Sequence, residues 1–139
     1  MHADPPDLER FVRGEVDAAD FPHHEHVRMG FEMLRRHDFA ETVWHFSRAL
    51  RAMTARAGKP QAFNQTVTIA FLSVIAERME CEPAADFAAF AHDNPDVFDR
   101  AALARWYRPE RLGSQLARRT FLLPEPNAPP APARATPRD

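Results

Sequence analysis

The segment from residue 65 to residue 80 constrains the fold of this 139-residue chain more than any other. Drawn as a helix, it is apolar over most of its circumference, and a helix of this kind usually lies at the centre of a protein. Asn64 precedes it and is a plausible N-cap. Its longest mostly apolar run, Val67 to Ala76, is too short to span a bilayer. The segment therefore predicts a central helix that does not span a membrane.

Two further long helices are predicted from the spacing of apolar residues. The first opens at Phe21-Pro22, because Pro is well tolerated in the first turn of a helix, and ends near His37. The second follows Asp38, which has the capping role in a capping-box pattern, and ends at Gly58. Only one or two residues separate these helices, so we expect them to pack antiparallel.

Shorter helices are predicted on either side of these three. Their expected places are Leu8 to Arg13 (ended by Gly14), 84–92, a start at Asp96 or Asp99, and a last helix capped by Ser114 that ends near Phe121. The Pro-, Ala- and Arg-rich residues 124–139 have little to bury, and we expect a disordered tail. The sequence thus predicts an all-α, single-domain helical bundle over residues 1–123, with three long helices and shorter C-terminal ones.

Composition excludes several classes of function. The formal net charge is −2, which gives no electrostatic case for nucleic-acid binding. Cys81 is the only cysteine, so no intrachain disulfide can form and nothing favours an oxidising compartment. The first residues lack a basic region followed by an apolar run, so no signal peptide is expected. We therefore expect a cytoplasmic protein.

Two histidines suggest a metal site. His23 and His26 are three residues apart, so they share one face of the expected helix. Neutral imidazole is the commonest metal ligand among side chains, and such a pair can reach one ion. Glu77 is the candidate third ligand, since an unpaired buried carboxylate on the central helix would be costly. Two histidines and one carboxylate would hold a divalent metal, Zn or Fe, with positions open for water or substrate.

A stripe of small and polar residues on the central helix gives further candidates. Thr66, Ala70, Ser73 and Glu77 are spaced four, three and four residues apart. Thr66 could act with Glu77 in catalysis, and the candidate substrate-binding residues are Asn64, Ser73 and His45. Gly30 either leaves room for a cavity or lets two helices pack closely.

Each candidate also has a structural interpretation. The histidines could form a polar first turn, and Glu77 could pair with an arginine. Thr66 and Ser73 could bond to carbonyls of their own helix, and Asn64 could be only a cap. His45, at the edge of an apolar stripe, could be a half-buried structural residue.

Five short motifs are spread over most of the chain: Phe21-x-His23-x-x-His26-Val27-Arg28, Phe63-x-x-Thr66-x-Thr68, Glu77-Arg78-Met79, Trp106-Tyr107 and Ala117-Arg118-x-x-Phe121. In these motifs the chain resembles a family of small bacterial all-helical proteins. The resemblance implies an all-helical fold and the same candidate residues, but no substrate. In that family an aromatic-His pair precedes the Thr-x-Thr, whereas this chain has Phe63-Asn64, which argues for a weaker metal site or none.

Two functions remain open at this point. One is a metal-dependent enzyme that acts on a small molecule in a pocket lined by His23, His26 and Glu77. The other is a non-catalytic helical module that binds a small ligand or a protein, with structural or pH-responsive histidines. A homodimer through an exposed Trp44 or Trp106 would favour the second. The first requires ligand atoms within about 3–4 Å of each other around one ion.

Overall fold

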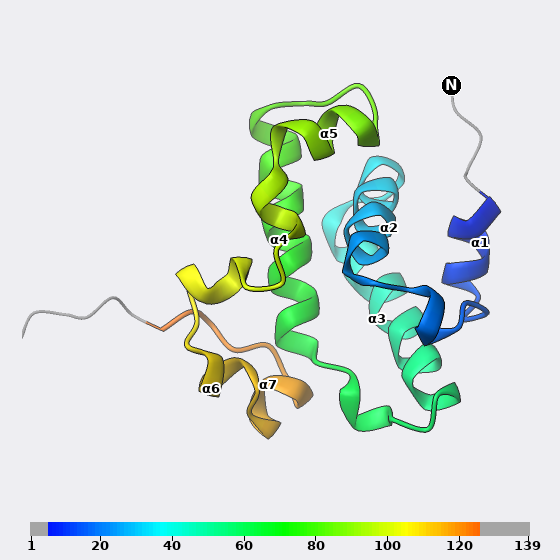
Figure 1. The fold of residues 1–139 in the computed structure, drawn as a ribbon, viewed down its shortest axis with the longest axis vertical. Helices are drawn as coiled ribbons and strands as arrows, with labels where there is room; N and C mark the ends of the chain where they lie inside the picture. The colour runs from blue at the N-terminus through cyan, green and yellow to red at the C-terminus, as the bar shows by residue number, and fades with distance from the viewer. Residues whose placement is uncertain (1–5, 126–139) are drawn as a thin grey trace, which may run out of the picture.

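The computed structural model describes residues 6–125, and every regular element among them is helical (Figure 1). The α-helices are α1 (Pro6–Val12), α2 (His23–Arg36), α3 (Phe39–Arg56), α4 (Gln65–Cys81), α5 (Phe87–Asp93), α6 (Pro109–Leu112) and α7 (Gln115–Arg119). Four 3₁₀ turns lie between them: η1 (Ala18–Asp20), η2 (Pro60–Ala62), η3 (Pro95–Phe98) and η4 (Ala102–Arg105). The prediction of an all-α bundle with three long helices is confirmed.

The starts of three helices are fixed by the predicted N-caps. The side chains of Asp38, Asn64 and Ser114 each accept a hydrogen bond from the backbone N–H three residues later, at 2.8, 3.0 and 3.1 Å. Each bond satisfies an N–H that has no partner within the helix. Local sequence therefore determines where α3, α4 and α7 begin.

Removing one of these caps should weaken the fold measurably. We expect Asp38→Ala to lower the free energy of unfolding by about 1 kcal/mol, because the Glu41 N–H loses its acceptor at the start of α3. Urea unfolding at neutral pH measures the change. Asp20→Ala is the control, since it replaces another exposed aspartate in a turn without a side-chain cap bond. Equal losses in the two variants would contradict the assignment of Asp38 as a cap.

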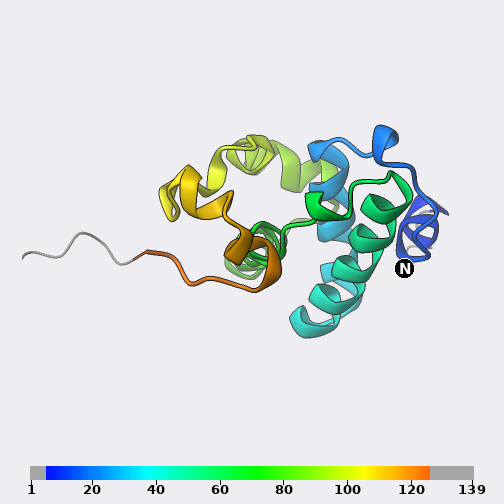
Figure 2. The ribbon, with the colours of Figure 1, turned by 90° about the horizontal axis from the view of Figure 1, so that it is seen from below.

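Helix α4 lies between the N-terminal helices α1–α3 and the C-terminal segment that contains α6 and α7. In Figures 1 and 2, α1, α2 and α3 lie to one side of α4 and α6 lies on the other, while α7 overlaps α4 in Figure 2. The contacts agree, because α4 touches α2 and α3 and also α7, η3 and η4. The prediction of a central helix at 65–80 is therefore confirmed. Helix α1 docks on the α2–α3 pair, where the ring of Phe11 stacks on Phe21 at 4.7 Å and meets the edge of Phe46 at 4.9 Å.

Gly30 lies at a close contact between α2 and α4. A Cβ atom at this position would lie 3.0 Å from Cδ2 of Leu72 and 3.3 Å from Cδ1 of Ile75. Contacts this short are tighter than ordinary van der Waals packing. Of the two alternatives for Gly30, close helix packing is the one found.

The C-terminal third differs from expectation in its details. Helix α5 begins at Phe87 rather than near residue 84, because Asp86 accepts a hydrogen bond from the Ala89 N–H at 2.9 Å. The helix expected from Asp96 or Asp99 is replaced by η3 and η4, and a bond from the Ala101 N–H to Asp99 lies between these turns. The predicted tail, 124–139, lies outside the described residues except for its first two.

Candidate functional site

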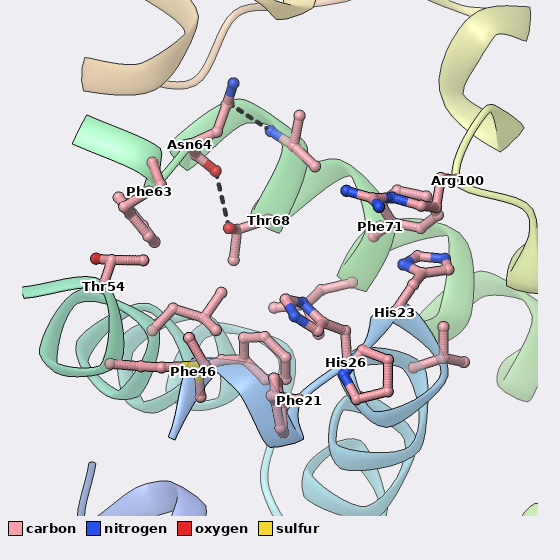
Figure 3. A pocket seen from close by; sticks show the side chains of 18 of the residues that line it. Phe21, His23, His26, Phe46, Thr54, Phe63, Asn64, Thr68, Phe71 and Arg100 are labelled. Atoms are coloured by element: carbon pink, nitrogen blue, oxygen red, sulfur yellow. Dashed lines mark hydrogen bonds between the residues drawn. The ribbon is translucent and has the colours of Figure 1, made fainter. Parts of the chain in front are cut away.

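A cavity of about 520 Å³ lies between α2, α3 and α4 (Figure 3). It is at the end of the bundle where α2 and α4 begin and α3 ends, and its volume is within the range of small-molecule sites. Most of the lining side chains are apolar: Ala18, Phe21, Pro22, Val27, Phe46, Leu50, Met53, Ala62, Phe63, Val67, Phe71, Leu72 and Ile75. The polar lining residues are His23, His26, Thr54, Asn64, Thr68 and Arg100.

The two predicted histidines both line this cavity, with ring centroids 6.3 Å apart. His23 donates a hydrogen bond from Nε2 to the Val97 carbonyl at 3.0 Å. A carbonyl oxygen only accepts, so the neutral His23 ring carries its proton on Nε2. In the neutral ring the other nitrogen is then a hydrogen-bond acceptor.

Burial keeps these rings neutral. It is the largest cause of the lowered pKa of His23 and of His26. The pKa of His26 falls from 6.5 to about 4 through burial first and then through the neighbouring His23, and the positive charge of Arg100 lowers the pKa of both rings. At neutral pH the cavity therefore contains an uncharged His26 with one free lone pair.

Glu77 does not join the histidines. Its side chain is exposed, as is that of Ser73, and neither residue lines the cavity. The expectation that Glu77 is buried is wrong: the C-terminal segment covers this face of α4 at Thr66, but the same face is exposed at Ser73 and Glu77. Within residues 6–125, no group of three or more His, Cys, Asp or Glu could hold a metal ion. The metal site stays a prediction without a third ligand.

Two other predicted site residues lie away from the cavity. Thr66 is fully buried, and its hydroxyl donates to the Thr120 carbonyl at 2.7 Å and accepts from the Leu122 N–H at 3.0 Å. It thus holds the C-terminal segment on α4. His45 lies at the opposite end of the α2–α3 pair, where its ring contacts His37 at 5.4 Å.

Asn64 does line the cavity, but its polar atoms are already engaged. Its side-chain oxygen caps α4, and its nitrogen donates to the Leu112 carbonyl at 2.7 Å. The hydroxyls of Thr68 and Thr54 donate to carbonyls of their own helices. This end of the cavity therefore has polar side chains, but most of their hydrogen bonds are made to other groups of the protein.

Arg100 was not identified from the sequence. It follows η3 and lies at the rim near His23 and Phe71 (Figure 3), with an exposed side chain. Nothing in its local sequence distinguishes it from the other exposed arginines, because its position depends on how the segment after α5 folds back onto α2. Phe63 and Thr68, by contrast, belong to the motif on which the family resemblance rests.

Comparisons of the chain with protein-family models, curated proteins and solved structures gave no match. The resemblance to a bacterial helical family therefore stays a prediction. In the part of the chain that the structure describes, no helix is both long and apolar enough to cross a membrane.

Proposed function

We propose that this protein binds a small, largely apolar molecule in the cavity between α2, α3 and α4. The observation that supports this proposal is a space of about 520 Å³ with mainly hydrocarbon walls and a few polar groups. Apolar walls favour an apolar guest because binding removes its surface from water. The remaining polar groups would set its orientation.

The hypothesis of a metal-dependent enzyme is the weaker of the two sequence-based alternatives. It needs a third ligand beside His23 and His26, and the exposed Glu77 is not positioned to supply one. A homodimer stays a prediction as well: Trp44 and Trp106 are both exposed, with 56% and 38% of their surface accessible. Neither idea explains the apolar cavity as directly as ligand binding does.

Binding of an uncharged fluorescent probe tests the proposal. N-phenyl-1-naphthylamine should bind the wild-type protein and become brighter in the apolar cavity. Thr54→Trp, which fills the cavity from α3, should weaken this binding at least tenfold. The matched control is Ala55→Trp, because Ala55 is the next residue on α3, is exposed and does not line the cavity. It should bind the probe as the wild type does.

Two results would contradict the proposal. One is a wild-type protein that binds neither this probe nor the smaller compounds named below. The other is equal binding by both tryptophan variants, which would place the probe outside this cavity. Urea unfolding of each variant checks that the fold is intact.

A further inference from the structure

The polar groups of the cavity are divided between its two ends (Figure 3). Thr54, Asn64 and Thr68 lie at one end, and their hydrogen bonds are made within the protein. His23, His26 and Arg100 lie at the other. At the first end, a ligand's polar group could meet only the remaining lone pairs of the two threonine hydroxyls. The histidine end offers it the imidazole nitrogens, which are stronger acceptors, and the Arg100 guanidinium.

At this end the imidazoles present acceptors. The proton of His23 is directed to the Val97 carbonyl, and the neutral ring of His26 keeps one unprotonated nitrogen that can accept a hydrogen bond. Within residues 6–125 no other group hydrogen-bonds to the second nitrogen of either ring. His26 is the ring that meets the apolar part of the cavity, since it contacts Phe21 at 4.5 Å and Phe46 at 6.5 Å between centroids.

Charged head groups fit this arrangement poorly. A carboxylate has no hydrogen to donate, so its oxygens would face the imidazole lone pairs. The cation Arg100 is exposed at the rim, where solvent and salt screen its attraction for an anion. A cationic ligand would find no Asp or Glu among the lining residues to balance its charge. The groups present favour an uncharged ligand that donates a hydrogen bond.

We propose that the ligand is an uncharged molecule with an apolar body and one hydroxyl group, as in an alkylphenol, and that this hydroxyl donates its hydrogen to the free ring nitrogen of His26. The body of the ligand lies between Phe46, Leu50 and Phe63, toward α3. This inference rests on the proposed function, which concerns the cavity alone and not the chemistry of its guest.

A set of compounds with the same apolar body tests the inference. Titration calorimetry at pH 7 would compare 4-butylphenol with 4-butylanisole, which lacks the donor hydrogen, and with 4-butylbenzoate, which carries a charge. One hydrogen bond predicts that the phenol binds about tenfold more tightly than the anisole. We expect the benzoate to bind more weakly than the phenol.

Two variants test whether His26 causes the preference for the phenol over the anisole. His26→Phe keeps an aromatic ring but removes the acceptor nitrogen. It should reduce the ratio of the binding constants of phenol and anisole to about one. His92→Phe is the control, because His92 is exposed on α5 and does not line the cavity; it should keep the wild-type ratio.

The outcomes separate this inference from the proposed function. Equal binding of phenol and anisole by the wild type would leave the function intact and overturn the inference. Tightest binding of the benzoate would overturn it too, and would point to Arg100 as the recognition group. If none of the compounds binds, the proposed function fails and the inference fails with it.

Discussion

Between pH 7 and pH 4, the wild-type protein should lose about 3 kcal/mol more unfolding free energy than the His26→Phe variant. Folding lowers the pKa of His26 from 6.5 to about 4, mainly through burial and then through the neighbouring His23. Between these two pH values the unfolded chain binds a proton that the folded protein does not. The stability from His26 is therefore complete above about pH 6.5 and is lost as the pH falls toward 4.

Urea unfolding at a series of pH values measures this difference. The lowered pKa of His23 acts in the same direction, but it is present in both proteins and leaves the comparison intact. Thr54→Ala is the control, because it alters the same cavity without removing an ionisable group and should show the full wild-type loss. The same pH dependence in wild type and His26→Phe would contradict a buried, neutral His26.

The second large effect is expected at Thr66. Thr66→Val keeps the shape of a side chain with no exposed surface, but it removes the hydroxyl that joins α4 to the C-terminal segment. The Thr120 carbonyl and the Leu122 N–H lose their partner together, and we expect about 2 kcal/mol of destabilisation. Hydrogen exchange should show faster exchange of the Leu122 amide.

Thr68→Val is the matched control for this change. Thr68 lies two residues further along α4, and its hydroxyl donates at 2.8 Å to the Asn64 carbonyl. That carbonyl also accepts the Thr68 backbone N–H, so the substitution leaves no group without a partner. We expect a loss of no more than about 0.5 kcal/mol. A similar loss in both variants would mean that Thr66 does not hold the C-terminal segment.

The three long helices could be predicted because their signals are local. Asp38 and Asn64 cap the helices that follow them, and Gly14 and Gly58, with φ of +73° and +76°, follow the ends of α1 and α3. Caps and glycines of this kind act within a few residues of the chain. The segment around η3 and η4 was harder to predict, since competing turns leave no long periodic pattern there.

The site was predicted only in part, because it depends on contacts between distant segments. The shared helical face of His23 and His26 is a local property, and both rings do line the cavity. The place of Glu77 depends on how far α7 covers α4, and periodicity along one helix does not specify this. Thr66 was selected as a polar group on a buried helix, but its partners lie more than fifty residues away.

Gly30 also affects the wall of the cavity. It does not itself line the cavity, yet the three atoms nearest to the side chain it lacks belong to Leu72, Ile75 and Phe46, which do. A methyl group at this position would press on Leu72 and Ile75, whose nearest atoms would lie 3.0 and 3.3 Å away, whereas Phe46 at 3.8 Å would be in ordinary contact. Under the proposed function, the size of Gly30 would therefore help to set the length of ligand that the cavity accepts, although Gly30 is not part of its wall.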